Sequence, residues 1–479
     1  MDQKQTPIFD ALLTWKRRQP YSFHVPGHKN GIIFPEKARD IYASLLSIDA
    51  TELTGLDDLH EPESAIFEAE QLAASFYGSK ACYFLVGGST VGNLAMILAT
   101  CQEDDIVFVQ RNSHKSVMNG LELANAKPVF LMPEVDEQTK VAKGVSLETI
   151  EAAYAKYPEA KTLVLTNPNY YGMTLDLRPI IEFAKKHGMT VLVDEAHGAH
   201  FGIGKPFPES AVSLGADVVV QSAHKTLPAM TMGSYLHVNG RYRFHDRLRY
   251  YLTVLQSSSP SYPIMASLDL ARFYLAQIDS GFINMIIESF HEFEIELTKI
   301  EGLFLIKSES ERYRQDPLKL IVQHSSGVSG FQLQQALEKS AVYPELADMF
   351  NVLFILPLAP LTNRETLIKT LTDAFKELAN QHDKPFAESI DFHFSEPFTT
   401  LACSYKEMIN SPTLSVPLHR AVGEVSAESV IPYPPGIPLL MKGEKITVWH
   451  VDMIRRLLQI GARFQGGKKL NEHHLVILK

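Results

Sequence analysis

The sequence contains few cysteines, and their arrangement argues against a disulfide-bonded protein. Cys82, Cys101 and Cys403 lie far apart, form no CxxC pair and are odd in number. Small secreted domains held by disulfides carry many cysteines at close spacing. We therefore expect free thiols and a reducing, cytoplasmic environment.

The sequence also lacks long apolar runs and an excess of basic residues. Its longest apolar run, Val352 to Leu361, contains two prolines and is too short to cross a bilayer. The first ten residues, MDQKQTPIFD, show no basic region leading into an apolar one, so no secretory signal is expected. Forty-five Lys and Arg against fifty-five Asp and Glu give a net charge of −10, which disfavours nucleic acid and anionic membranes as partners.

The length and composition indicate a multi-domain protein of enzyme size. The chain has 479 residues, of which 45% are hydrophobic and 21% charged, close to the globular average. At roughly 150 residues per domain, the length corresponds to about three domains.

Short apolar runs alternate with segments of helical period from about Leu72 to Val220. This alternation predicts an α/β domain with a mostly parallel sheet covered by helices. Helices are expected before Gly78 and before Gly188, because glycine is favoured just after a helix C-terminus. The expected strands are Ala81 to Val86, Ile106 to Gln110, Pro128 to Met132, Thr162 to Thr166, Thr190 to Asp194 and Asp217 to Gln221.

Breaks in this pattern suggest four parts of the chain. Residues 1–60 are rich in proline and too irregular for a regular element, so they are expected to form an N-terminal arm. A large domain, 61–300, would end in one long amphipathic helix from Ile264 to about Ile300, and a small α+β domain would cover 301–378. A polar linker, 380–385, would lead to a C-terminal domain, 386–479, whose proline-rich stretch 431–438 cannot be helical.

Polar residues follow several of the expected strands, at the edge of the sheet where open α/β proteins bind ligands. Gly87-Gly88-Ser89-Thr90 precedes a helical segment, and such a helix N-terminus suits a phosphate group. The same residues are also ordinary turn and N-cap residues, so a phosphate role stays open on this evidence alone.

Asp194 and Lys225 are the candidate reactive pair. Asp194 ends a buried apolar strand, which favours a specific partner for its carboxylate, although an N-cap or an ion pair would serve equally. Lys225 follows His224 just after another expected strand, where burial and neighbouring charge could lower its pKa, whereas most lysines are simply solvated. A phosphate loop, a strand-end aspartate and a downstream Ser-x-His-Lys together form the layout of a pyridoxal-phosphate site.

The chain resembles the Orn/Lys/Arg decarboxylases over nearly its whole length, in the short form that lacks an N-terminal wing domain. The motifs that carry the resemblance are VPGHK (25–29), LDDLH (56–60), RNSHKS (111–116), DEAHG (194–198), SAHK (222–225) and PYPPG (432–436). The resemblance implies an aspartate-aminotransferase-like (fold type I) large domain that binds pyridoxal 5'-phosphate at residues 61–300, a small α+β domain and a C-terminal decarboxylase domain.

The resemblance also implies a role for each cofactor residue. Lys225 would form the Schiff base with the cofactor and Asp194 would pair with the pyridine nitrogen. His114 would stack on the ring and His197 would lie near its phenolic oxygen. The phosphate would be held by Ser89, Thr90, Ser222 and His224.

Two details qualify this assignment. Many relatives have Gly-Thr-Ser where this chain has Gly88-Ser89-Thr90, and the residues after Lys225 also differ, which leaves the role of Thr226 open. His197 and His200 form an H-x-x-H pair, but no second cluster completes a ligand set, so no metal is expected.

The expected reaction is decarboxylation of a basic L-amino acid. Arginine, giving agmatine for polyamine biosynthesis, is favoured, while lysine and ornithine stay open, as do an aminotransferase or aldolase of the same fold and a non-catalytic regulatory homologue. The family resemblance implies a homodimer or larger homo-oligomer with shared active sites. The candidate carboxylates for a cationic substrate are Asp57, Asp58, Glu345, Asp348 and Glu428, each of which could equally be structural.

Overall fold

The chain forms two compact units, each described here by itself. The computed structural model describes residues 1–239, 243–308, 310, 312–325, 328–379, 396–432, 437–459 and 461–479. One unit comprises Met1–Thr100 and Ile181–Ser280, and the other comprises Cys101–Ile180 and Gly281–Lys479. The predicted linker 380–385 and residues 433–436 of the proline-rich stretch lie outside the described residues. The four-part division expected from the sequence stays a prediction.

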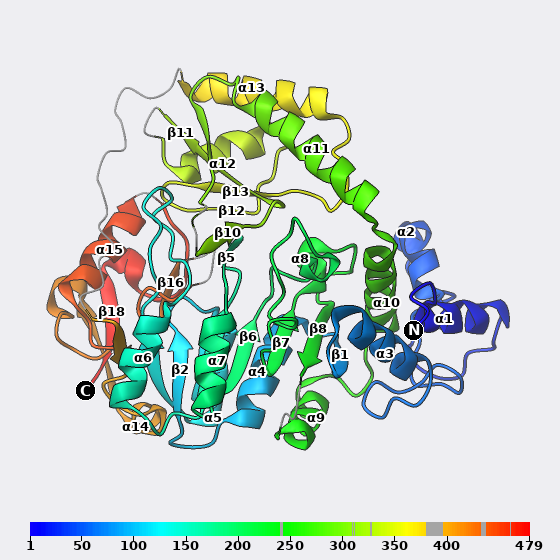
Figure 1. Ribbon diagram of the computed structural model, residues 1–479, viewed down its shortest axis with the longest axis horizontal. Helices are drawn as coiled ribbons and strands as arrows, with labels where there is room; N and C mark the ends of the chain where they lie inside the picture. The colour runs from blue at the N-terminus through cyan, green and yellow to red at the C-terminus, as the bar shows by residue number, and fades with distance from the viewer. Residues whose placement is uncertain are drawn as a thin grey trace. The chain divides into compact units, whose positions relative to one another are not determined.

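The first unit contains four strands with helices around them (Figure 1). Its elements are α1 (Pro7–Arg17), α2 (Glu36–Leu46), α3 (Ala65–Tyr77), β1 (Ala81–Leu85), α4 (Gly88–Thr100), most of α7 (Arg178–Lys186), β6 (Thr190–Asp194), η1 (Phe201–Ile203), β7 (Val218–Gln221), α8 (Ala223–Thr226), β8 (Ser234–Val238), α9 (His245–Leu255) and α10 (Tyr262–Gln277).

The strands of the first unit bring three loops to one edge of the sheet. Their order is β1-β8-β7-β6, with β6 and β7 parallel and β8 antiparallel to both β7 and β1. The carboxyl ends of β1, β6 and β7 therefore share an edge. Helix α4 packs closely on this sheet, because a Cβ atom on Gly92 would lie only 2.4 Å from Val220 Cγ2.

The N-terminal arm is more regular than the sequence suggested. Residues 1–60 contain the helices α1 and α2, so the expectation of no regular element was wrong. Pro7 is the first residue of α1, where proline lacks no hydrogen bond, and Pro35 immediately precedes α2. The buried guanidinium of Arg272 in α10 anchors the start of the arm by donating to the carbonyl oxygen atoms of Gln3 and Gln5.

The long helix expected from Ile264 to about Ile300 is interrupted. Helix α10 ends at Gln277, and Ile278 has an extended backbone conformation. A separate helix, α11, starts at Ser280 directly after Asp279, a residue type favoured before a helix N-terminus. The apolar period continues through this break, which is why the sequence pattern alone did not reveal it.

The second unit contains the remaining strands and helices. They are β2 (Ile106–Gln110), α5 (Lys115–Ala124), β3 (Lys127–Leu131), α6 (Leu147–Lys156), β4 (Thr162–Thr166), β5 (Met173–Leu175), α11 (Ser280–Leu297), β9 (Leu303–Ile306), β10 (Tyr313–Gln315), β11 (Lys319–His324), α12 (Gly330–Lys339), β12 (Leu346–Ala347), β13 (Val352–Ile355), α13 (Arg364–Ala379), β14 (Phe398–Thr400), α14 (Tyr405–Asn410), β15 (Thr413–Pro417), η2 (Leu418–Arg420), β16 (Val430–Pro432), α15 (Val448–Gln459), β17 (Phe464–Gly466), η3 (Leu470–Glu472) and β18 (His474–Leu478).

These elements form several sheets and a separate C-terminal core. The strands β4, β2 and β3 are parallel, and β14 joins β3 antiparallel. An antiparallel sheet has the order β12-β13-β11-β9. The C-terminal region packs around a core of its own that includes Leu440, Ile454 and Leu475, and it carries the pairs β15–β18 and β16–β17.

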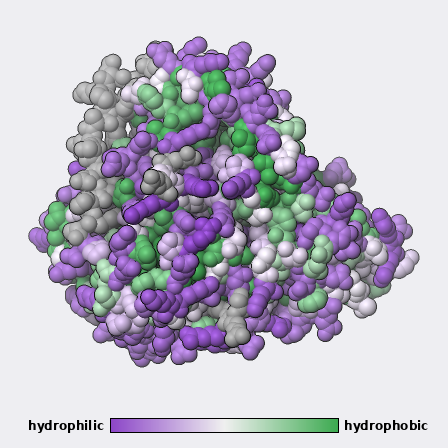
Figure 2. Space-filling view, viewed as in Figure 1, coloured by the Kyte–Doolittle hydropathy of each residue, from purple (hydrophilic) through white to green (hydrophobic). Residues whose placement is uncertain are grey.

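The surface mixes hydrophilic and hydrophobic side chains. On the face shown in Figure 2, purple hydrophilic residues are interspersed with smaller green hydrophobic areas. Within the described residues, no helix has both the length and the apolar character needed to cross a membrane.

Helix α3 buries an acidic side chain against β1. Glu70 is 5% exposed, and its carboxyl accepts a hydrogen bond of 2.9 Å from the backbone N–H of Phe84. Glu70 lines a cavity of about 270 Å³ together with Cys82, Tyr83 and Arg249. Burial raises the pKa of Glu70 from 4.5 to about 8.

We expect Glu70→Gln to stabilise the protein increasingly as the pH rises. Between the unfolded pKa of 4.5 and the folded pKa of about 8, the unfolded state loses the Glu70 proton while the folded state keeps it. Wild-type stability therefore falls with pH by up to ~1.4 kcal/mol per unit, whereas glutamine keeps the acceptor oxygen and does not titrate. Thermal unfolding at pH 5 and pH 8 measures the difference.

The exposed Glu68 on the same helix provides the matched control. Glu68→Gln should leave the pH dependence of the unfolding temperature unchanged. An advantage of Glu70→Gln that is the same at both pH values would contradict the raised pKa.

Candidate functional site

The loop after β1 brings two serine hydroxyls together. Gly88 has φ +75°, a conformation that favours glycine, and its N–H donates to the carbonyl oxygen of Met232 at 2.8 Å. Helix α4 starts here, and Ser89 Oγ accepts a hydrogen bond of 2.8 Å from Ser222 Oγ, which follows β7. Thr90 is exposed at the same helix N-terminus. Two serine hydroxyls at a helix N-terminus suit an anion.

Asp194 lies at the end of β6 with its carboxylate buried and oriented. It is 2% exposed, and Oδ2 accepts a hydrogen bond of 2.8 Å from Asn93 Nδ2. The other oxygen accepts from the backbone N–H of Ala196 at 3.1 Å. The sequence analysis did not identify Asn93, although it is a single buried amide in the apolar part of α4, and that contrast was a usable signal.

Lys225 contacts His197 directly. Lys225 Nζ lies 3.0 Å from His197 Nε2, although 28 residues separate them in the chain. His197 is 3% exposed, so its ring has little access to water, and Lys225 is half-buried. This geometry permits proton exchange between the amine and the imidazole. His224, the residue before Lys225, has its Nδ1 3.1 Å from the carbonyl oxygen of Gly233.

Glu195, next to Asp194, is a buried acid that the sequence analysis did not identify. Glu195 is fully buried and accepts hydrogen bonds from Ser210 Oγ (2.6 Å), Ala211 N (2.7 Å) and Gln221 Nε2 (2.6 Å). Burial raises the pKa of Glu195 to about 7, although these three bonds act in the opposite direction. The turn stays compact because a Cβ atom on Gly198 would lie 2.6 Å from Glu195 Cγ.

The hydrogen bonds of Glu195 continue through Gln221 to His237 in β8. Gln221 Oε1 accepts from His237 Nε2 at 3.1 Å, and His237 Nδ1 lies 3.3 Å from Ser79 Oγ. Burial lowers the pKa of His237 to about 3, so its ring is neutral near pH 7. Glu195 thus links the turn after β6 to the last residue of β7.

The arrangement fits pyridoxal 5'-phosphate. The hydroxyl of Thr226, next to Lys225, is buried and has no hydrogen-bond partner within the described part of the chain. Buried hydroxyls are nearly always hydrogen-bonded, and an acceptor-rich group such as a phosphate would supply the missing bond. This cofactor requires an amine, a carboxylate and an anion-binding position for its phosphate. Lys225, Asp194 and the N-terminus of α4 supply these three groups.

His114 belongs to the second unit. It immediately precedes α5, and its Nδ1 accepts from the backbone N–H of Ser116 at 3.3 Å, with Ser116 Oγ at 2.8 Å. A ring nitrogen that accepts from a backbone N–H carries no proton, so the proton of the neutral ring is on Nε2. The ring is half-buried.

Three of the five candidate substrate carboxylates are occupied by donors from their own surroundings. Asp57 accepts from the backbone N–H groups of Glu63, Ser64 and Ile66, and these bonds lower its pKa although burial acts in the opposite direction. Glu428 accepts from the backbone N–H groups of Lys468 and Val476. Asp348 accepts from Tyr171, Phe350 and Asn351, and burial raises its pKa.

Asp58 and Glu345 have fewer such bonds. One oxygen of Asp58 accepts from the backbone N–H of His60 at 2.8 Å, and Glu345 is exposed. Asp58 lies in the first unit and Glu345 in the second.

Comparisons with known proteins identify the family. Residues 6–364 match the model of the Orn/Lys/Arg decarboxylase major domain, and residues 384–469 match that of the Orn/Lys/Arg decarboxylase C-terminal domain. The chain is similar to the uncharacterized protein YaaO of Bacillus subtilis, with 46% identity over 475 residues that cover 98% of each chain. It is 33% identical to an arginine decarboxylase of the same organism over 487 residues, which cover 100% of this chain and 99% of the relative.

The fold is also found among solved structures. The lysine decarboxylase LdcF of Francisella novicida superimposes with a TM-score of 0.83 at 18% identity, covering 98% of this chain and 80% of that one. The predicted aspartate-aminotransferase-like fold class is thereby confirmed. Because two family models together cover almost the whole sequence, the chain belongs to the Orn/Lys/Arg decarboxylase family of pyridoxal-phosphate-dependent carboxy-lyases.

Proposed function

We propose that this protein decarboxylates a basic L-amino acid, with L-arginine giving agmatine as the favoured reaction, in cytoplasmic polyamine biosynthesis. The observation that carries the proposal is the contact of 3.0 Å between Lys225 Nζ and His197 Nε2 beside the oriented carboxylate of Asp194. The 33% identity to an arginine decarboxylase over the whole chain supports arginine over lysine and ornithine.

Lys225, Asp194 and the hydroxyl residues would hold the cofactor. When bound, pyridoxal phosphate withdraws the electron pair that remains at the α-carbon after carbon dioxide leaves. Lys225 would bind the cofactor covalently through Nζ. Asp194, held by Asn93, would keep a proton on the pyridine nitrogen, because a buried carboxylate favours a cationic partner. Ser89, Thr90, Ser222 and His224 would bind the phosphate, and Thr226 would join them through its buried hydroxyl.

The residues around Lys225 would also move protons. With cofactor and substrate bound, Lys225 Nζ would donate a proton to the α-carbon. His197 Nε2, at 3.0 Å, would exchange a proton with that amine and lies among groups with little access to water. We propose that His114 stacks on the cofactor ring, with its proton on Nε2 as the contact with Ser116 requires.

A cationic side chain of the substrate would require a carboxylate with an oxygen that is not already hydrogen-bonded to the protein. Asp57, Asp348 and Glu428 have both oxygens occupied by neighbouring donors, so we assign them structural roles. Asp58 and Glu345 are the carboxylates that we propose for the substrate side chain.

We propose a homodimer or a larger homo-oligomer as the working unit. The arm exposes apolar side chains that a monomer would leave in water, including Tyr21 (93% exposed), Phe23 (95%) and Ile41 (82%). Clustered exposed apolar residues mark association surfaces. A second copy of the chain would cover them.

The substrate assay tests the proposed reaction. We expect protein loaded with pyridoxal phosphate to release carbon dioxide from L-arginine with a kcat/KM at least about tenfold above that for L-lysine or L-ornithine, a difference of ~1.4 kcal/mol in transition-state binding. Formation of keto acid in place of carbon dioxide would indicate transamination. Inactivity towards all three amino acids would refute the proposal.

Lys225→Ala tests the site assignment. We expect this variant to lose the visible absorption band of the lysine-bound cofactor, because no other amine would be positioned to form the bond. Activity should fall by about a thousandfold or more, as for other covalent catalysts. Lys186→Ala, an exposed lysine on α7, provides the control and should keep both properties. An unchanged band in Lys225→Ala would show that another residue binds the cofactor.

Glu195→Gln tests whether the buried acid positions the site. The glutamine amide nitrogen would oppose the amide of Gln221, so one hydrogen bond is lost and kcat should fall by about tenfold, equivalent to ~1.4 kcal/mol. Above pH 7, where Glu195 carries a charge, its removal should also lower the pKa of the lysine-bound cofactor, which absorption against pH measures.

The control for Glu195 is Asp217, a half-buried carboxyl beside the same sheet with a raised pKa. Asp217 accepts from the backbone N–H of Val191 at the opposite end of β6. Asp217→Asn should affect unfolding temperature but neither kcat nor the absorption band. Equal effects of the two substitutions on the band would argue against a positioning role for Glu195.

A further inference from the structure

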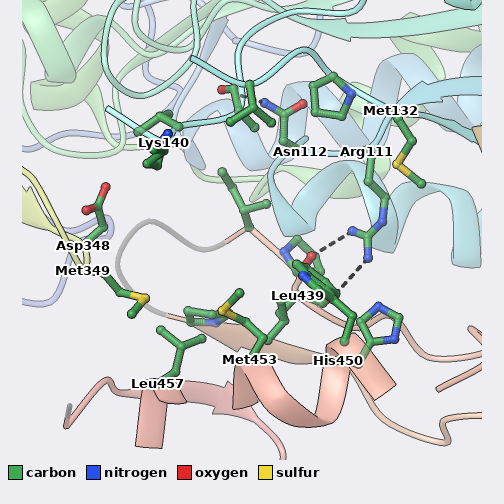
Figure 3. Close-up of a pocket in the computed structure, with 18 of the residues that line it drawn as sticks. Arg111, Asn112, Met132, Lys140, Asp348, Met349, Leu439, His450, Met453 and Leu457 are labelled. Atoms are coloured by element: carbon green, nitrogen blue, oxygen red, sulfur yellow. Dashed lines mark hydrogen bonds between the residues drawn. The ribbon is translucent and has the colours of Figure 1, made fainter. Parts of the chain in front are cut away.

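The segment that carries His114 is tied to the C-terminal domain by a buried arginine. Arg111 follows β2 and is 8% exposed. Its guanidinium donates to the carbonyl oxygen of Pro438 at 2.8 Å, to that of Leu439 at 3.2 Å and to Glu444 Oε2 at 2.9 Å. Figure 3 shows the Arg111 side chain extending toward Leu439, with His450 close by. These three acceptors belong to the C-terminal domain.

Glu444 is itself fixed in place. It is 7% exposed, and the oxygen that accepts from Arg111 also accepts from the backbone N–H of Met441 at 2.8 Å. A buried charge that loses its partner is strongly unfavourable, so the pair cannot separate at little cost. The contact between Arg111 and Glu444 is therefore a stable link between the two regions.

Two more polar contacts connect helix α5, which begins directly after His114, to the C-terminal domain. Lys115, the residue after His114, donates to Gln465 Oε1 in β17. Near the far end of α5, Glu122 accepts from Lys442 Nζ at 2.6 Å. Both ends of α5 are therefore attached to the C-terminal domain, and His114 lies between two of the three attachment points.

A pocket borders these contacts. A cavity of about 540 Å³ in the second unit is lined by Arg111, Asn112, Leu439, His450 and Met453. Figure 3 shows side chains of residues that follow β2 and β3 and of α15 around this space. Residues 111–115 are held by directional polar bonds, to the C-terminal domain and, through Asn112 and Ser113, to Lys143 and Thr166.

We propose that the C-terminal domain positions the ring-stacking histidine, and that Glu444 and Gln465 are positioning residues of the cofactor site acting through Arg111 and Lys115. The inference rests on the proposed function, because it takes the stacking role of His114 from there. It assigns the C-terminal domain a part in cofactor binding through contacts remote from the cofactor.

A double-mutant cycle on the full chain tests this inference. The variants are Glu444→Gln, Gln465→Leu and His114→Ala, each alone, and His114→Ala combined with each of the other two. The readouts are the dissociation constant for pyridoxal phosphate, from titration of the apoenzyme, and the absorption maximum of the bound cofactor. Lys406→Gln removes an exposed contact between the C-terminal domain and Glu103, away from the His114 segment, and is the control.

We expect Glu444→Gln and Gln465→Leu each to raise the dissociation constant about tenfold and to shift the absorption maximum, with Lys406→Gln like wild type. In the His114→Ala background, neither substitution should weaken binding by more than about twofold, because coupled residues are not additive. Gln465→Leu removes a neutral side chain and keeps the test valid should Glu444→Gln fail to fold, which circular dichroism would show.

Two results would overturn the inference, and they differ from each other. The first is wild-type binding of the cofactor by both Gln465→Leu and folded Glu444→Gln, or an effect of these substitutions that multiplies with that of His114→Ala. Either outcome would show that the C-terminal domain does not act through His114. Wild-type binding and absorption in His114→Ala would refute the stacking role itself, and with it the inference, while leaving the role of Lys225 intact.

Discussion

The hydrogen-bonded carboxyl of Glu195 is the interaction that ties together the loops of the first unit. It joins the turn after β6, which carries Asp194 and His197, to the end of β7, which leads to Lys225. No water reaches this buried group to replace a lost bond, so the two loops are held in one relative position. The contact between His197 and Lys225 joins the same two loops.

Much of the fold followed from the sequence because the strands of the large domain end where apolar, β-branched runs meet polar residues. The strand expected at Thr162 to Thr166 matches β4, and that expected at Thr190 to Asp194 matches β6. The arm and the long helix were misjudged for local reasons. Pro7 is harmless at the first position of α1, and the break after Gln277 leaves the apolar period intact.

The candidate site was only partly accessible to sequence reasoning. Motifs placed Lys225 and Asp194, whereas the partners of these residues depend on contacts across long separations. Asn93 and Asp194 are 101 residues apart, and Glu195 and Gln221 are 26 apart. A sequence also does not show which carboxylates are already occupied, and backbone N–H groups take up the oxygens of Asp57 and Glu428.

The direction of the hydrogen bonds behind Asp194 has a consequence for proton transport. His237 donates to Gln221, which donates to Glu195, so the bonds run one way from the sheet toward the buried acid. A glutamine amide does not relay protons as water or a hydroxyl does, and His237 does not become charged near neutral pH. This series of hydrogen bonds therefore does not conduct protons. Glu195 is shielded from rapid exchange with solvent protons along this route.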